Sequence, residues 1–391
     1  MRILYHHRTQ AEDGQAVHIR ALIEAFRAEG HEVRESALVP RAGPRADGSR
    51  ANGAAGRPRW SFVDAVPRFV RELGEYGYSV PARRRLARDA RAFGPDFLYE
   101  RYAFGNAGGV RAAEQLGLPL VLEVNSPMVL ELSRTRGLSF PRFAERLERS
   151  IFRRATRVAV VTGVLRDMLV AMGVERERLL VTPNGVHLEA FEQPDRAAAR
   201  ADLGLEAHED GGGLVFGFVG YYRDWHRLDL ALEALAGPGL EAAQLVLVGA
   251  GPAEKALRAR AGELGVARRV RFAGPRPHAR IPALLAAFDV GLVPAINPYA
   301  SPLKLHEYMA AGLAVLAPDQ PNLREVLAHE ENALLLAPGD GAALAEAMAR
   351  LARDPELRAR LGAAARRTVR ERDLTWRGNA RRVVEAVGAI R

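Results

Sequence analysis

Lys304 and Glu307 are a basic and an acidic residue three positions apart in the segment SPLKLHEYMAAG, residues 301–312. This spacing places both side chains on one face of a helix. An ammonium group in the first turn can contact a phosphate as a point charge. A carboxylate one turn further can accept hydrogen bonds from a ribose diol. The alternative is an ordinary surface ion pair, and the spacing alone does not decide between the two.

The helix that carries this pair is expected to begin at Pro302, with Ser301 as its N-cap and Gly312 at its C-terminal end. It follows the apolar run DVGLVP, which reads as a buried strand. A helix that starts just after a parallel strand directs its free N–H groups toward the ligand side of the sheet. An anion-binding site is therefore expected there, formed by Ser301, Pro302, Leu303 and Lys304.

A second polar turn follows the strand in GFVGYYRDWHR, residues 217–227. Gly220 ends that strand, and Arg223 and His226 come directly after it. A guanidinium group at this point could bind a second phosphate in a bidentate way. The alternative is a loop of solvated arginines, which is plausible in a chain so rich in arginine.

In the first half of the chain, a polar loop links the first strand to the first helix and contains His7, Gly14 and Gln15. Loops of this kind lie at the ligand edge of α/β sheets. Glu123 and Asn125 end a later strand at alternate positions, so they share a face. They could bind a polyol or assist proton transfer, or they could form a buried hydrogen-bonded pair. We assign His7, Gln15, Glu123 and Asn125 to the acceptor side.

Apolar runs alternate with amphipathic helical stretches along the whole chain, which is the pattern of βαβ units on a parallel sheet. The sequence predicts an α/β protein with two facing, Rossmann-like, doubly wound domains and a central cleft. The expected divisions are residues 1–185, 186–370 and a C-terminal helix in 371–391 that packs back toward the N-terminal domain. Residues 41–59, rich in Gly, Pro and Arg, are expected to form a mobile loop.

The composition is that of a soluble globular protein, with 391 residues, no cysteine, a formal charge of +9 and a pI near 10.3. We expect a cytoplasmic protein with no metal site and no nucleic-acid partner, because thiolates and nucleic-acid-binding motifs are absent. Two arginine-rich helical segments, residues 81–93 and 143–157, leave open a weak peripheral contact with the inner face of an anionic membrane.

Together these segments resemble the retaining, nucleotide-sugar-dependent glycosyltransferases of family four, which have the GT-B fold. The resemblance is carried by TPNGVHLEAF, GFVGYYRDWHR and SPLKLHEYMAAGLAVLAPDQPNLREVL, followed by ENALLLAPGD. The segments HHRTQAEDGQAVHIRAL, LYERYAF and LEVNSP are similar to a bacterial exopolysaccharide-type branch. The resemblance covers nearly the whole chain.

The resemblance implies a role for individual residues of the donor site. Glu307 matches the glutamate that holds the donor ribose, and Lys304 matches the diphosphate contact. The resemblance also places Arg223 on the diphosphate, Arg276 against the base and Gly14 near the donor phosphate. Two positions depart from the family pattern: Tyr299 stands where a first glutamate is usual, and His226 stands where a lysine is usual.

The implied reaction moves a sugar from a nucleoside diphosphate donor, with UDP favoured, to an acceptor hydroxyl with retention of configuration. The resemblance implies neither an enzyme nucleophile nor a metal, and the absence of an Asp-x-Asp triplet agrees with the latter. We expect Arg223, Lys304 and Glu307 to carry the chemistry. A nucleotide-sugar epimerase and a non-catalytic anion-binding protein remain as alternatives. The acceptor, whether a sugar, a lipid-linked glycan or a small molecule, stays open.

Overall fold

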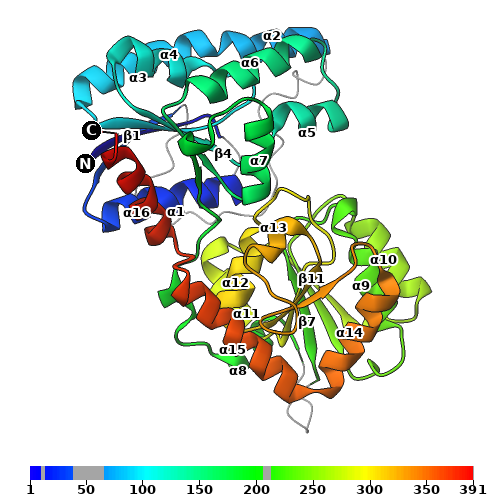
Figure 1. Ribbon diagram of the computed structural model, residues 1–391. Coiled ribbons are helices and arrows are strands. Elements are labelled where there is room, and N and C mark those ends of the chain that lie inside the picture. Colours follow the sequence, from blue (N-terminus) through cyan, green and yellow to red (C-terminus); the bar gives the residue numbers. More distant parts are fainter. Residues whose placement is uncertain (10–13, 38–65, 206–212, 391) are drawn as a thin grey trace. The chain divides into compact units, whose positions relative to one another are not determined.

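The computed structural model describes residues 1–9, 14–37, 66–205 and 213–390. The chain forms two compact units, Met1–Pro183 with Trp376–Arg391, and Asn184–Thr375 (Figure 1). The sequence placed the divisions after residues 185 and 370, two and five residues from the observed ones. The loop expected at residues 41–59 lies outside the described residues.

The sheet of the first unit has six parallel strands in the order β2-β1-β3-β4-β5-β6. The strands are β1 (Arg2–His7), β2 (Glu32–Ala37), β3 (Phe97–Arg101), β4 (Leu120–Val124), β5 (Arg157–Val160) and β6 (Leu179–Val181). β3 and β4 are buried along their whole length, as expected for parallel strands that helices cover on both faces.

The helices of this unit are α1 (Gly14–Ala28), α2 (Arg68–Gly77), α3 (Ser79–Phe93), α4 (Gly108–Leu116), α5 (Met128–Thr135), α6 (Pro141–Arg154), α7 (Gly163–Ala171) and α16 (Trp376–Gly388). Two of their first turns are capped by buried carboxylates from other helices, in place of local side chains. Glu72 of α2 accepts the N–H groups of Ser139 and Phe140 at the start of α6, at 2.6 and 3.1 Å. Glu148 of α6 accepts the N–H of Val129 in α5, at 3.1 Å.

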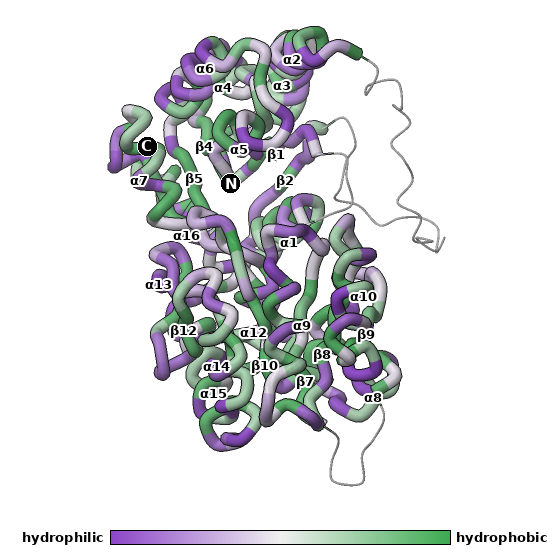
Figure 2. The backbone as a smooth tube through the Cα atoms, turned by 90° about the vertical axis from the view of Figure 1, so that its right-hand side faces the viewer, coloured by the Kyte–Doolittle hydropathy of each residue, from purple (hydrophilic) through white to green (hydrophobic). Residues whose placement is uncertain are grey.

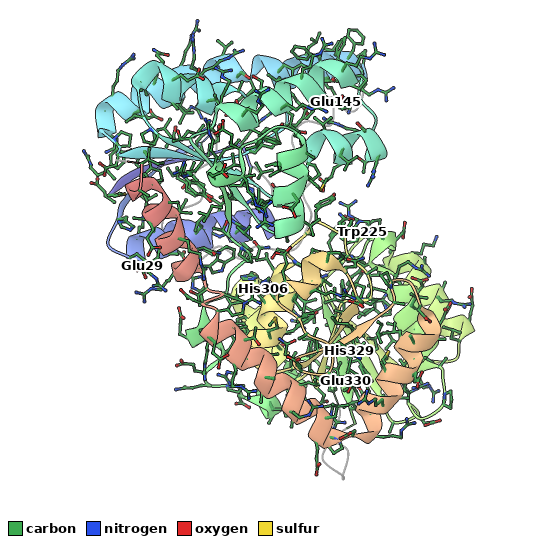
Figure 3. All side chains as sticks on the ribbon, in the orientation of Figure 1. Glu29, Glu145, Trp225, His306, His329 and Glu330 are labelled. Carbon is green, nitrogen blue, oxygen red and sulfur yellow. The ribbon has the colours of Figure 1, made fainter. Side chains whose placement is uncertain are left out.

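The last helix, α16, belongs to the first unit and packs against α1 (Figure 1, red against blue). The Trp376 ring meets the His18 ring edge to face, with centroids 4.7 Å apart. Glu29, which follows α1 and is labelled in Figure 3, pairs with Arg377 at 2.6 Å and Arg381 at 3.0 Å. The two ends of the chain therefore complete one folded unit.

The sheet of the second unit also has six parallel strands, in the order β12-β11-β10-β7-β8-β9. The strands are β7 (Val215–Val219), β8 (Gln244–Val248), β9 (Val270–Gly274), β10 (Val290–Leu292), β11 (Ala314–Pro318) and β12 (Leu334–Leu336). The chain runs outward from β7 to β9 on one side and from β10 to β12 on the other. This is a doubly wound sheet whose order reverses between β7 and β10.

The helices of the second unit are α8 (Arg196–Asp202), α9 (Leu228–Leu235), α10 (Glu254–Glu263), α11 (Ile281–Leu285), α12 (Leu303–Ala311), α13 (Pro321–Arg324), α14 (Gly341–Arg353) and α15 (Pro355–Glu371). Two apolar clusters, one built around α11, α12 and α15 and the other around α9 and α14, enclose the sheet. In the hydropathy view the strands of this unit are largely green and the helix surfaces carry most of the purple (Figure 2). The predicted class, two Rossmann-like α/β domains, is confirmed.

Candidate functional site

The carboxyl ends of β7 and β10 are neighbours in the second sheet, and the chain leaves them in opposite directions. A crevice that can hold a ligand forms at such a point because no connection covers it. Gly220 follows β7 directly, and the loop after β10 leads to α12. The Lys304 segment and the Gly220 segment, 84 positions apart by number, are thus brought together as their patterns predicted.

Lys304 lies in the first turn of α12 and reaches back to the end of β7. Its Nζ atom is 3.4 Å from Nε2 of His226 and 3.8 Å from the centroid of the Phe218 ring. Gly220 has φ +144°, and a Cβ atom there would lie 3.0 Å from the same Nζ. Glycine at this position therefore leaves the space that the ammonium group occupies.

Burial sets the charge of this pair. Loss of hydration lowers the pKa of Lys304 to about 7, and the neighbouring Glu307 opposes that shift. Burial and then the charge of Lys304 lower the pKa of His226 to about 3. His226 is therefore neutral at physiological pH, and its Nδ1 atom accepts the backbone N–H of Arg223 at 3.4 Å.

The start of α12 differs from the sequence prediction. The N-cap is Pro302, with extended φ and ψ, and the helix begins at Leu303. The Ser301 hydroxyl does not cap it, because that oxygen accepts the backbone N–H of Asn184 at 3.1 Å. The Asn184 side chain also donates to the Ser301 carbonyl. Since proline has no N–H, Ser301 and Leu303 are the donors left in the expected 301–303 cradle.

Glu307 lies one turn behind Lys304 and is buried, with 6% of its surface exposed. Its Oε1 atom is 2.6 Å from Nε2 of His278, whose side chain is 41% exposed. His278 lies just after β9, in a polar turn at the same carboxyl edge of the sheet. Sequence analysis missed His278, and its place after a strand end was the only signal available.

The other predicted donor-side residues are distributed around this centre. Arg223 is exposed, with its guanidinium 4.8 Å from the Tyr221 ring centroid. Arg276 is directed to α8, where its guanidinium lies 3.7 Å from Asp202. Tyr299 is buried in the loop before α12. The side-chain amide of Asn322 holds that loop by donating to the carbonyls of Asn297 and Ala300.

Glu123 in the first unit forms the centre of a buried polar cluster. Its carboxylate accepts from Tyr99 at 2.9 Å and from Arg101 and Asn125, and it lies 3.2 Å from His18. Burial opposes its ionisation, but His18 and Arg101 outweigh that effect and hold the pKa of Glu123 well below its usual value. Donors from the protein thus surround the Glu123 carboxylate, and this carboxylate positions their side chains. Of the two roles considered for Glu123 and Asn125, the buried hydrogen-bonded pair is the one observed.

The remaining acceptor-side candidates are spread over the first unit. His7 is fully buried on β1, with Nε2 2.7 Å from Glu35 of β2, because residue 7 faces the packed interior of the sheet. The structure therefore contradicts its assignment to a ligand-facing loop. Gly14 and Gln15 form the exposed start of α1.

A second buried pair, missed in the sequence, joins the carboxyl ends of β1 and β3. His6 Nε2 lies 3.6 Å from Glu100 Oε1. Burial lowers the pKa of His6 to about 4 and raises the pKa of Glu100 to about 8. Both groups are therefore neutral at pH 7, which avoids the cost of two buried charges.

The two Rossmann-like units are those of the GT-B fold, and comparison with known proteins gives the family. Residues 13–190 match the family described as "Glycosyltransferase Family 4", and residues 206–368 match "Glycosyl transferases group 1". The two matches together cover most of the chain. The chain belongs to the family 4 glycosyltransferases with the GT-B fold.

Curated relatives agree with this assignment. The chain is 29% identical over 296 residues to the D-inositol 3-phosphate glycosyltransferase of Saccharomonospora viridis, covering 72% of this chain and 67% of that protein. It is 31% identical over 259 residues to the 2-deoxystreptamine glucosyltransferase of Streptomyces kanamyceticus, covering 63% of this chain and 65% of that protein. The matched segments thus span about two thirds of the length of these relatives.

Solved structures share the fold at low identity. Anabaena Alr3699/HepE in complex with UDP superposes with a TM-score of 0.74 at 19% identity, with full coverage of both chains. Sucrose-phosphate synthase from Thermosynechococcus elongatus superposes with a TM-score of 0.72 at 21% identity, covering 100% of this chain and 98% of that one.

Proposed function

We propose that this glycosyltransferase transfers a sugar from a nucleoside diphosphate sugar to an acceptor hydroxyl with retention of configuration, and that the second unit binds the donor. The observation that carries the proposal is the position of the Lys304 ammonium at the β7–β10 crevice, 3.4 Å from His226. A cation held among apolar groups interacts strongly with an anion because little water competes. Uridine diphosphate is the first nucleotide to test, since Anabaena HepE has been crystallised with UDP and with UDP-glucose.

Lys304 would contact the diphosphate of the donor, helped by the N–H groups at the start of α12. The bond between the anomeric carbon and the phosphate oxygen breaks, and the leaving diphosphate gains negative charge. Lys304 then stabilises that charge in the transition state. The acceptor oxygen bonds to the anomeric carbon, and its proton passes to the leaving diphosphate.

Glu307 would accept hydrogen bonds from the donor ribose, with His278 orienting its carboxylate through the 2.6 Å contact. Arg223, on an exposed turn at the same edge, could reach the outer phosphate. In this proposal the donor side requires no metal. The acceptor and its linkage are left to experiment.

The test combines binding and turnover. Thermal-shift measurements with UDP, GDP, ADP and their glucose conjugates should show stabilisation by one base family, because a bound ligand raises stability by mass action. Transfer is then measured with the stabilising donor against a panel of acceptors, with and without EDTA, and the anomer of the product is assigned by NMR. Inversion of the anomer would contradict retention. Consumption of the donor to an epimer without any acceptor would contradict transfer itself.

A further inference from the structure

Exposed large apolar side chains are concentrated on one face of the first unit. The described residues have nine such side chains, and six of them lie on or beside α2, α3 and α6. These six, which we call the α2–α6 apolar patch, are Phe69, Val70, Leu73, Val80, Phe140 and Phe143. Contiguous exposed apolar surface of this kind marks a binding face.

The patch is continuous across two helices. Phe69 and Leu73 are one turn apart on α2, so their side chains lie on the same face, and they are 50% and 52% exposed. Phe143 of α6 packs edge to face on Tyr76 of α2, with centroids 4.9 Å apart. This ring contact and the hydrogen bonds of Glu72 to the start of α6 hold the two helices together.

Hydrogen bonds hold the helices beneath the α2–α6 apolar patch in place. Glu72 binds the backbone at the start of α6 through Ser139 and Phe140, and its side chain also accepts from the Tyr76 hydroxyl at 2.6 Å. Arg68 donates to the Arg136 carbonyl at 3.0 Å. The exposed phenylalanines thus project from a hydrogen-bonded framework.

Unpaired arginines border the patch. Arg142, Arg146 and Arg149 are exposed on α6, at spacings of four and three residues that place them on one face. Within the described part of the chain none of the three forms an ion pair. Glu145 is the exposed acid of the same helix region (Figure 3). The border is therefore cationic.

We propose that the α2–α6 apolar patch docks this chain on an anionic lipid bilayer. Phe69, Leu73 and Phe143 would enter the headgroup boundary, as the apolar face of an interfacial helix does. The arginines of α6 would then contact lipid phosphates. Among the described residues no helix is long and apolar enough to span a membrane, so the contact is one of surface docking. The proposal stands whatever the second unit binds.

Charge favours a bilayer over a second copy of the chain. A twofold interface centred on this patch would place the same surface on both sides. The unpaired arginines of two copies would then approach each other, at a cost in like-charge repulsion. An anionic leaflet attracts the arginines through its charge. Its acyl boundary also accommodates the apolar phenylalanine side chains.

The test is co-sedimentation of the full chain with phosphatidylcholine vesicles containing zero or 30% phosphatidylglycerol. The wild type should pellet with the anionic vesicles, and added salt should weaken the binding. F69S/L73S/F143S should lose binding by at least about tenfold, since each buried apolar group contributes to interfacial affinity. R142E/R146E should lose on the order of tenfold on anionic vesicles.

Matched controls lie away from the patch. R268E/R353E makes the same change in charge on the second unit. I390S replaces an exposed apolar side chain just after α16 with a polar one. Both variants should bind the vesicles as the wild type does. Near-UV circular dichroism checks that each variant is folded. Absence of wild-type binding, equal loss in R268E/R353E, or a wild-type dimer in sedimentation equilibrium that F69S/L73S/F143S abolishes would each overturn the proposal.

Discussion

The Nζ atom of Lys304 lies 3.4 Å from Nε2 of the buried His226, and both side chains contact the Phe218 ring. Two groups that can each carry a positive charge thus share one small space. The histidine gives up its proton first, because its pKa falls to about 3 while that of Lys304 falls to about 7. Near pH 7 Lys304 is therefore only partly protonated, and a bound anion would favour its fully charged form.

Replacement of Lys304 tests its proposed role in charge stabilisation. Lys304→Ala should lower kcat by on the order of a hundredfold, the usual loss when one preorganised donor is removed from a developing anion. Lys255→Ala, at an exposed position of α10, is the matched control and should retain full activity. A Lys304→Ala variant with near-wild-type turnover would remove Lys304 from the mechanism.

The lowered pKa of Lys304 predicts a pH-dependent donor affinity. Below pH 7 the ammonium is already formed, so binding needs no proton. Above pH 7 the free lysine is largely neutral, and a bound diphosphate, which favours the charged form, must draw in a proton. The affinity for UDP-glucose should then fall by up to about tenfold per pH unit.

Calorimetry in buffers of different ionisation enthalpy measures this proton uptake directly. The uptake should approach zero at pH 6, rise above pH 7 and vanish in Lys304→Ala. Uptake that persists in the variant would assign the proton to another group.

The contact between His278 and Glu307 predicts separate effects on binding and chemistry. Glu307→Gln and His278→Ala should each raise the KM for the donor, with about 1–3 kcal/mol lost when a hydrogen bond to a charged group is removed. The kcat should change little in His278→Ala, since this residue acts through Glu307. If kcat fell and KM stayed constant, His278 would belong to the reaction centre.

The buried cluster around Glu123 predicts a large loss of stability. Glu123→Gln leaves Arg101 with an uncompensated buried charge, so urea unfolding should show a loss of about 3–5 kcal/mol. Glu114→Gln removes the partner of Arg154 in an exposed pair and should cost less than about 1 kcal/mol. Equal losses in the two variants would mean that burial does not determine the cost.

Two glycines with positive φ provide a steric comparison. A Cβ atom at Gly249, φ +138°, would lie 1.9 Å from the Gly220 carbonyl oxygen, whereas at Gly117, φ +64°, it would meet nothing within 4 Å. Gly117→Ala should therefore cost about 1 kcal/mol through backbone strain alone. Gly249→Ala should cost more, and it should also weaken donor binding because Gly220 must move. Thermal unfolding and thermal shift with UDP measure the two effects.

Most of the fold could be predicted from the sequence because the strands are short apolar runs that end at glycine, proline or polar residues. β4 and β7, for example, coincide with LPLVLEVN and LVFGFVG. The meeting of Lys304 with the β7 turn also followed from pattern, since both segments leave neighbouring carboxyl ends of one sheet. The glycine at position 312 does end α12, with φ +74°.

The contacts between side chains could not be predicted in the same way. Ser301 has the residue type of an N-cap, yet Asn184, more than a hundred positions earlier, occupies its hydroxyl. Local propensity contains no information on such a partner. His278 and two of the donors to Glu123, Tyr99 and Arg101, were missed for the same reason, because elements that are far apart in the sequence bring them together.

The closure of the first unit by α16 has a consequence for biosynthesis. Until the ribosome has added Trp376–Gly388, α1 lacks its partner, and the Trp376 contact with His18 cannot yet exist. The second unit is continuous from Asn184 to Thr375 and is complete earlier. Domains usually mature from the N-terminus onward during translation. Here the unit that is synthesised first is the last that can finish folding.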